Sequence, residues 1–243
     1  MHKLISAVLS LIFLVSMSVR AETVTFAIGD WEPFTSAKDP KSKLTEKVVI
    51  EALKLEGLDA SFAYFPWKRA STLLEEGGFD GSFPWGLTDD RAKLFHYTTT
   101  TVLKDESVYF HLKTTKFDWN TIQDLKKYKV GVTIGFSNEK LYKDLGIPAD
   151  AVVLEDLNFK KMLVGRLDVY DTSKSVGLAL IAKLFTPEEA KLFTYHSKII
   201  SNHEYYGIFS KVSPKGKLYA DKLESGLKKL KASGAYDKIM SQL

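Results

Sequence analysis

The chain has 243 residues, of which 45% are hydrophobic and 26% are charged, and it contains no cysteine. These fractions match an average soluble globular protein, so they exclude a disordered, collagen-like or low-complexity chain. The absence of cysteine excludes a disulfide scaffold, a zinc site built on thiolates and a cysteine nucleophile. The net charge of +4 comes from interspersed charges of both signs. This pattern favours solubility and does not predict nucleic-acid binding.

Residues 1–21 have the pattern of a cleaved signal peptide. A short basic start is followed by an apolar run from Leu4 to Met17 and by small residues around Ala21. The apolar run is shorter than the ~20 residues that a membrane-spanning helix needs, although an uncleaved anchor is the alternative. We therefore expect cleavage after Ala21. Without a lipid-modified cysteine, the protein is expected to be free in the periplasm.

The chain from residue 23 onward alternates between strand and helix patterns. The first part predicts strands at 23–28, 60–65 and 80–83, with helices at 44–53 and 67–76 between them. Strands that alternate with helices favour a parallel or mixed sheet with helices on both faces.

The same order of elements restarts near residue 120. The pattern here predicts a short helix that ends at 125–127, strands at 129–134 and 167–170, and later helices. Those helices are expected at 138–145, at 158–164 with Asn158 as its cap, after the capping box Thr186–Glu189, and within 217–240.

Two β-rich stretches, 107–113 and 204–210, lie between these α/β blocks. Two extended crossings between two lobes would form a hinge. A ligand would then bind in the cleft beyond the carboxyl ends of the strands.

Four short motifs occur in the order and spacing of a known family. They are WEPF at 31–34, TDDR at 88–91, KVGVT at 129–133 followed by Gly135, and GRLD at 165–168. Along nearly all of its length after the signal peptide, the chain resembles a periplasmic solute-binding protein of the polar amino-acid ABC-importer type, bacterial extracellular solute-binding protein family 3. The resemblance implies an α/β, two-lobed, type II periplasmic-binding-protein fold, with mixed sheets covered by helices and a two-strand hinge.

The resemblance also implies a domain organisation and partners. Lobe 1 would comprise residues 22–109 and 206–243, and lobe 2 residues 110–205. The expected partners are a small polar, carboxylate-bearing solute and an inner-membrane ABC permease. We expect a monomer with no cofactor, no metal and no nucleic acid bound.

Arg91 is the strongest candidate for a ligand-binding residue in the first lobe. Thr88 is placed to cap a helix whose first turn contains Arg91, although a cation there opposes the helix dipole. A guanidinium offers a planar fork of donors for a carboxylate, and Arg91 matches the carboxylate-binding arginine of the family. The alternative is a surface ion pair with Asp89 or Asp90.

Aromatic residues are predicted to line the same side of the cleft. Trp31 occupies the position where the family places an aromatic that covers the ligand, and packing in the core is its alternative. Trp67, Arg69 and Trp85 are weaker candidates at the cleft rim. The sequence departs from the family at Pro84, which has no N–H to donate. The usual carboxylate site is therefore altered.

In the second lobe we expect Ser137 and Asp171 to contribute. Ser137 opens a predicted helix whose positive end would attract an anionic group, unless the serine is simply an N-cap. Asp171 is the acid nearest to the position of the family's ammonium-binding carboxylate, although Lys174 could neutralise it. Asp168 is predicted to be structural.

Three functions remain open at this level. The first is a transport receptor for a polar solute. The second is an enzyme on the same fold that resembles cyclohexadienyl dehydratase and uses Glu32 or Asp171 with Arg91. The third is a sensor that presents its closed form to a membrane signalling partner. We expect the first function, the transport receptor, and for it we predict no catalytic residues.

Overall fold

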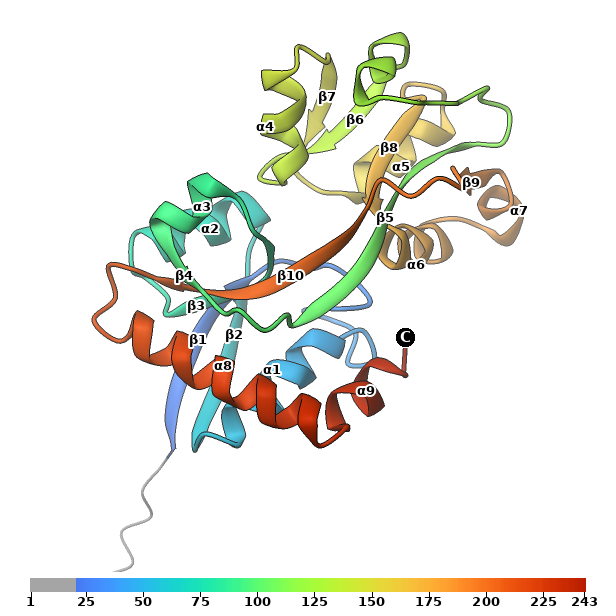
Figure 1. Ribbon diagram of the computed structural model, residues 1–243. Coiled ribbons are helices and arrows are strands. Elements are labelled where there is room, and N and C mark those ends of the chain that lie inside the picture. The colour runs from blue at the N-terminus through green and yellow to red at the C-terminus, as the bar shows by residue number, and fades with distance from the viewer. Residues whose placement is uncertain (1–20) are drawn as a thin grey trace, which may run out of the picture.

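The computed structural model describes residues 21–243, so the signal peptide predicted at the N-terminus lies outside the described residues except for Ala21. One mixed sheet of ten strands, surrounded by helices, runs through this part of the chain (Figure 1). Its strands are β1 (Glu22–Ile28), β2 (Leu58–Tyr64), β3 (Gly81–Gly86), β4 (Phe95–Tyr97), β5 (Leu103–Leu112), β6 (Val130–Thr133), β7 (Ala149–Val152), β8 (Val169–Ser173), β9 (Phe193–Tyr195) and β10 (Ser201–Ser210).

The helices follow the predicted alternation with the strands. They are α1 (Leu44–Lys54), α2 (Trp67–Glu75), α3 (Asp89–Leu94), the 3-10 helix η1 (Ile122–Lys127), α4 (Ser137–Asp144), α5 (Asp156–Leu163), α6 (Lys174–Leu184), α7 (Pro187–Ala190), α8 (Gly216–Ala232) and α9 (Ala235–Met240). None of these helices is both long enough and apolar enough to span a bilayer.

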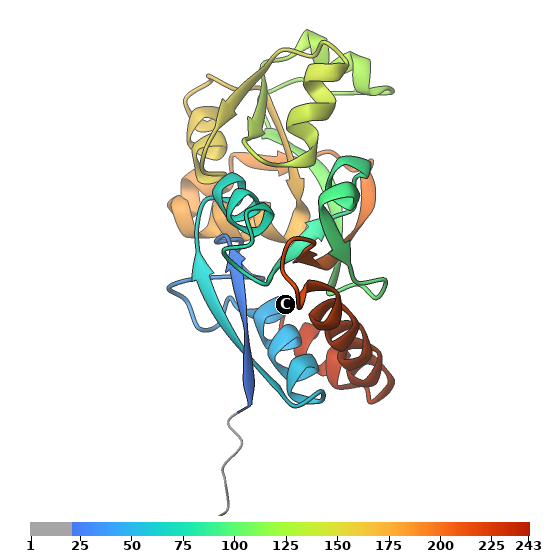
Figure 2. The same ribbon diagram turned by 90° about the vertical axis from the view of Figure 1, so that its left-hand side faces the viewer.

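The two long strands β5 and β10 join two blocks of structure. The sheet order is β2-β1-β3-β10-β5-β8-β6-β7, with β4 also paired to β10 and β9 to β5. The first block contains β1–β4 with α1–α3, α8 and α9, and the second contains β6–β9 with η1 and α4–α7. Figure 1 shows β5 and β10 as the extended connection between the blocks, and Figure 2 shows one block above the other.

Each block repeats the same local topology. β1 lies between β2 and β3 and is parallel to both, just as β6 lies between β7 and β8 and is parallel to both. In each block the chain first adds a strand on one side of the central strand (β1 or β6) and then on the other side. Because crossovers between parallel strands are right-handed, this change of side places successive helices on opposite faces of the sheet. The change of side also opens a crevice beyond the carboxyl ends of β1 and β6, and ligands bind at this position in α/β sheets.

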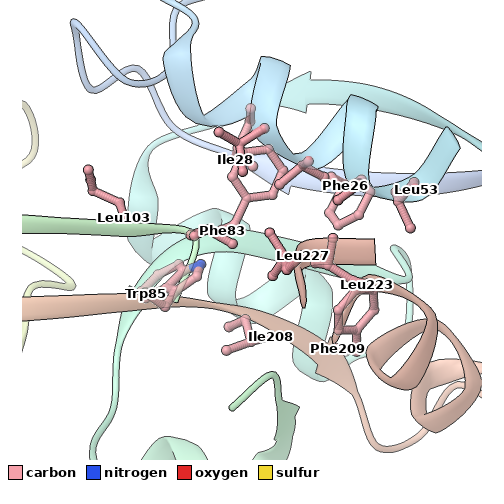
Figure 3. Close-up of a cluster of buried hydrophobic side chains, with 14 of the residues drawn as sticks. Phe26, Ile28, Leu53, Phe83, Trp85, Leu103, Ile208, Phe209, Leu223 and Leu227 are labelled. Carbon is pink, nitrogen blue, oxygen red and sulfur yellow. The ribbon is translucent and has the colours of Figure 1, made fainter. Parts of the chain in front are cut away.

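The first block is held together by a large aromatic and aliphatic core, drawn in Figure 3. Phe26 packs edge-to-face against Phe83 and Phe209, with ring centroids 5.3 and 5.8 Å away. Helix α8 lies against α1 at Gly226, where an added Cβ would come within 2.0 Å of the Ala52 carbonyl oxygen. The predicted apolar face of α1 supplies Leu44, Val48, Val49, Ala52 and Leu53, all of which are buried.

Two smaller clusters form the core of the second block. One is centred on Phe110, Phe159 and Tyr170, and the other contains Tyr109 and Tyr142. The first block thus has one core and the second block has two. Each half of the sheet buries its own apolar faces, which explains why the chain of alternating strands and helices folds into two blocks.

Two local predictions differ from the structure. Asn158 does not cap a helix, because α5 begins at Asp156 and the buried Asn158 amide instead donates to Thr133 Oγ1 at 3.1 Å. The strand predicted at 167–170 is β8, which extends to Ser173 and therefore includes Asp171. In both cases pairing with residues distant in sequence overrides the local pattern.

Candidate functional site

A cavity of about 300 Å³ lies between the two blocks. It is formed where four strands end, at the crevice that the topology predicts. The lining residues nearest to these ends are Trp31 beyond β1, Pro84–Gly86 in β3, Gly135–Ser137 beyond β6, and Asp171–Ser173 in β8. Strands β5 and β10 contribute Ser107, Tyr109, Ser201, His203 and Tyr205.

Most of the residues predicted for the site line this cavity. Arg69 does not, because its side chain is exposed and its guanidinium carbon lies 5.6 Å from the centre of the Phe65 ring. The predicted residues that line the cavity are Trp31, Trp67, Trp85, Arg91, Ser137 and Asp171.

Three tryptophans and a tyrosine form an aromatic wall on the side of the first block. The ring of Trp31 lies 5.0 Å from that of Tyr205 and 6.5 Å from that of Trp67, which lies 5.2 Å from Trp85. The rings meet edge-to-face, the arrangement that aromatic quadrupoles favour. Trp85 Nε1 donates to Ser82 Oγ at 2.6 Å, which orients that ring, whereas Trp31 Nε1 is buried without a hydrogen-bond partner.

Arg91 bridges the two blocks across one end of the cavity. Thr88 Oγ1 accepts from the Arg91 backbone N–H at 3.3 Å, so the predicted helix cap is confirmed. The guanidinium lies 4.6 Å from the Trp85 ring centre, where Nη1 donates to Gly86 O at 3.2 Å and Nη2 donates to Gly135 O at 2.8 Å. Burial lowers the pKa of Arg91. Its side chain makes no ion pair with Asp89 or Asp90; instead, Asp90 pairs with Lys93.

Ser137 begins α4 and lines the cavity from the second block. Its hydroxyl is not an N-cap, because Phe136 occupies the cap position and no side chain caps the helix. The first turn of α4 contains Glu139, whose Oε2 accepts from the Gly135 backbone N–H at 2.7 Å. The negative charge of Glu139 already compensates the positive end of this helix.

Asp171 presents the acidic group of the second block. Its Oδ1 accepts from Asn138 Nδ2 at 2.8 Å and from the Tyr142 hydroxyl at 2.5 Å. Burial raises the pKa of Asp171, while these two hydrogen bonds act to lower it. Lys174 does not neutralise Asp171, because its Nζ lies 3.2 Å from Glu106 Oε2.

Other acidic residues lie outside the cavity lining. Glu32 forms an ion pair with Lys183 of the second block, with Nζ 2.8 Å from both carboxylate oxygens. The structure therefore does not bring Glu32 together with Arg91. Asp168 accepts from the Lys129 backbone N–H at 2.8 Å, which confirms its predicted structural role. Within residues 21–243, no three His, Cys, Asp or Glu side chains are grouped to hold a metal ion.

Several residues that line the cavity were not expected from the sequence. Asn138 and Tyr142 follow Ser137 on α4, and their i, i+4 spacing places them on one face of the helix, so this signal was available. Tyr109 and Tyr205 also line the cavity. Both lie in the two stretches predicted as hinge crossings, 107–113 and 204–210. Residues of a crossing strand carry no local motif for a binding site.

Comparisons with known proteins agree on the fold. No protein-family model and no curated protein matches the chain. Among solved structures, an ancestral arginine-binding protein bound to arginine is similar at 21% identity and a TM-score of 0.76, covering 90% of this chain and 97% of that one. The amino-acid ABC transporter substrate-binding protein AbpA from Streptococcus pneumoniae, bound to L-arginine, is 18% identical with a TM-score of 0.73, covering 90% and 93%.

A histidine kinase sensor domain with similarity to periplasmic binding proteins is also similar. It is 15% identical with a TM-score of 0.79, covering 92% of this chain and 96% of that one. The chain therefore has the periplasmic-binding-protein fold, which confirms the predicted fold class.

Proposed function

We propose that the protein is a solute-binding receptor that captures a small polar molecule, an amino acid or a related compound, for an ABC importer. The observation that carries this proposal is the cavity between the two blocks, with walls supplied by both. Trp85 and Arg91 face it from the first block, whereas Asn138 and Asp171 face it from the second. A site divided in this way is completed only when the blocks come together, so binding and closure are coupled.

The two blocks act as lobes in this proposal. Lobe 1 comprises residues 22–109 and 206–243, and lobe 2 residues 110–205, with the hinge in β5 and β10 near Tyr109 and Tyr206. Contacts that link the lobes include the hydrogen bond from Arg91 to Gly135, the ion pair of Glu32 with Lys183, and the ion pair of Asp90 with Lys140 at 4.0 Å. Rigid-body closure about the two crossing strands would make or break these contacts.

The proposed partner is an inner-membrane ABC permease, and the proposed location is the periplasm. One structural relative is described as an ABC transporter substrate-binding protein, which supports the transport role. The predicted cleavage after Ala21 supports export.

A thermal-shift screen of the purified protein tests the receptor function. The protein is denatured and refolded to remove bound solute, then tested against amino acids, amines, small carboxylates and opines. A ligand at one hundred times its dissociation constant adds about 2.7 kcal/mol of stability, a clear rise in melting temperature. If no compound of a broad panel raises the melting temperature, the receptor function is wrong.

A sensor role is the second candidate, because a kinase sensor domain shares the fold over almost its whole length. Deletion of the protein in its host separates the two. A transport receptor is required for uptake of the radiolabelled ligand. A sensor leaves uptake intact and removes the transcriptional response to that ligand.

A further inference from the structure

Arg91, the cationic side chain of the cavity lining that could hold an anion, already has protein partners. The neutral donors Trp31 Nε1 and Ser201 Oγ, which also belong to lining residues, have none. Both terminal nitrogens of Arg91 donate to backbone carbonyls, of Gly86 and Gly135, and the guanidinium face lies on Trp85. A carboxylate that displaced the Gly135 carbonyl from Arg91 would break a contact with the other block, and one that used the remaining N–H groups would share the guanidinium with that carbonyl. The free energy of that exchange reduces the gain from the new ion pair.

The start of α4 offers little more to an anion. The Gly135 backbone N–H, which lies just before the helix, donates to Glu139 Oε2. The Glu139 carboxylate is in the first turn, where it screens the positive end of the helix from a second negative charge.

The end of β3 is similarly poor in donors. Pro84 has no N–H, and the next two residues are paired with β10, Trp85 opposite Tyr206 and Gly86 opposite Tyr205. Burial lowers the pKa of His203, the other basic side chain of the lining, and therefore disfavours a positive charge on it.

Acceptors, by contrast, are available on the second block. The Asp171 carboxylate fixes the orientation of the Asn138 amide, because the NH₂ group must face it. Asn138 Oδ1 therefore points elsewhere, and it is buried without a partner. Within the described residues, the side-chain donors to Asp171 both reach Oδ1, which leaves Oδ2 able to accept.

We propose that the cavity selects an organic amine without a carboxylate, and that Asn138 Oδ1 and Asp171 Oδ2 receive its ammonium group. This inference rests on the proposed function and names its solute class. An ammonium carries three donors, enough for both oxygens. The three tryptophans of the aromatic wall, Trp31, Trp67 and Trp85, then pack against the organic part of the amine. An α-carboxylate on the same solute would be buried where Arg91 is already engaged and the free donors are neutral, which disfavours the parent amino acid.

Matched pairs of amines and their parent amino acids test this selection. Isothermal titration calorimetry on the refolded protein compares agmatine with L-arginine, cadaverine with L-lysine, tyramine with L-tyrosine and tryptamine with L-tryptophan. We expect at least one amine to bind at least tenfold more tightly than its parent amino acid, and no amino acid of the panel to bind more tightly than its amine.

Other outcomes separate this inference from the proposed function. An amino acid, small carboxylate or opine of the thermal-shift panel that binds more tightly than every amine overturns the inference and leaves the receptor function standing. Absence of binding by every compound of both panels overturns both.

Asn138→Ala examines the proposed acceptor directly. We expect the affinity for the best amine to fall at least tenfold, while Asn202→Ala, at an exposed asparagine of β10, leaves it unchanged. The melting temperature without ligand reports whether each variant is folded. Asn138→Ser, a smaller change, serves if Asn138→Ala is not folded. Unchanged amine affinity in a folded Asn138 variant shows that this amide does not receive the ammonium.

Discussion

The guanidinium of Arg91 and the carbonyl of Gly135 are joined by a 2.8 Å hydrogen bond, although the two residues lie in different blocks. Gly135 has a positive φ of 91°, and a Cβ there would lie 3.0 Å from the backbone nitrogen of Lys68. The left-handed conformation and the close approach both require glycine at this position. The turn after β6 thus brings a carbonyl to Arg91 and α4 to the cavity.

Arg91→Ala is expected to weaken solute binding by removing this connection between the blocks. A hydrogen bond to a charged group contributes about 1.5–3 kcal/mol, so affinity should fall on the order of tenfold to a hundredfold. If Arg91 acts through closure, an amine and its parent amino acid lose affinity by similar factors in calorimetry. A loss confined to the amino acids would show instead that Arg91 binds their carboxylate. Arg166→Ala, at an exposed arginine, is the matched control.

Lys183→Gln is expected to shift the protein toward an open form. The Lys183 side chain is 54% exposed and that of Glu32 only 12%, so the ion pair lies at the edge of the interface between the blocks. Such pairs contribute roughly 0.2–1 kcal/mol, so the effect on affinity is at most about fivefold and shrinks in high salt. Small-angle scattering should show a larger mean radius of gyration. Lys191→Gln breaks an exposed pair with Glu188 at the end of α7 and should not change the radius.

Asp171→Asn is expected to reduce binding of a cationic solute without destabilising the fold. The asparagine retains an oxygen that accepts from Tyr142. The substitution also removes a buried carboxylate, and burial disfavours the charged form of Asp171, as its raised pKa indicates. Loss of the charge removes the counter-ion of an ammonium group, which lowers affinity by more than tenfold. Calorimetry and the melting temperature without ligand are measured together. A lower melting temperature with unchanged affinity would contradict this role, and Asp221→Asn at an exposed site is the control.

Stability is expected to fall as the pH rises from about 4.5 to 7, because of Glu155. Burial raises the pKa of this carboxyl from 4.5 to about 7, while hydrogen bonds from Thr172 and Tyr170 partly oppose the shift. The folded state therefore binds the proton more tightly than the unfolded state, and the stability it contributes is complete below pH 4.5 and lost above pH 7. The loss is no more than about 3 kcal/mol.

Glu155→Gln should remove that pH dependence, since glutamine resembles the protonated acid and keeps an acceptor for both hydroxyls. Urea unfolding at pH 5 and pH 8 measures it. The variant should match the wild type at pH 5 and exceed it at pH 8. An equal difference at both pH values would contradict the assignment, and Glu188→Gln at an exposed position should leave the pH dependence as in the wild type.

Gly29→Ala is expected to disturb the aromatic wall. A Cβ at Gly29 would lie 2.5 Å from Trp67 Cε2, so the indole ring must move. Overpacking of this kind costs about 1–3 kcal/mol. Urea unfolding should show this loss, and ligand affinity should fall with it because Trp67 lines the cavity. Gly86→Ala is the comparison for packing, because a Cβ there meets no atom within 4 Å.

The sequence by itself determined the alternation of strands and helices and six of the residues that line the cavity. Local signals suffice for these features. Periodicity identifies the buried face of α1, and residues that follow strands in an α/β fold gather at one edge of the sheet. For this reason Trp31, Trp85 and Ser137 could be placed near the cavity before their neighbours were known.

Only the tertiary structure decided what these side chains contact. The partner of Arg91 is a carbonyl 44 residues away, and that of Lys174 is Glu106, 68 residues away. Asn138 became part of the site because β8 brings Asp171 against α4, a pairing that no local pattern encodes. Hydrogen bonds and ion pairs depend on distances of a few ångströms between segments far apart in the chain. Which donors remain free for a solute is therefore decided when those segments pack together.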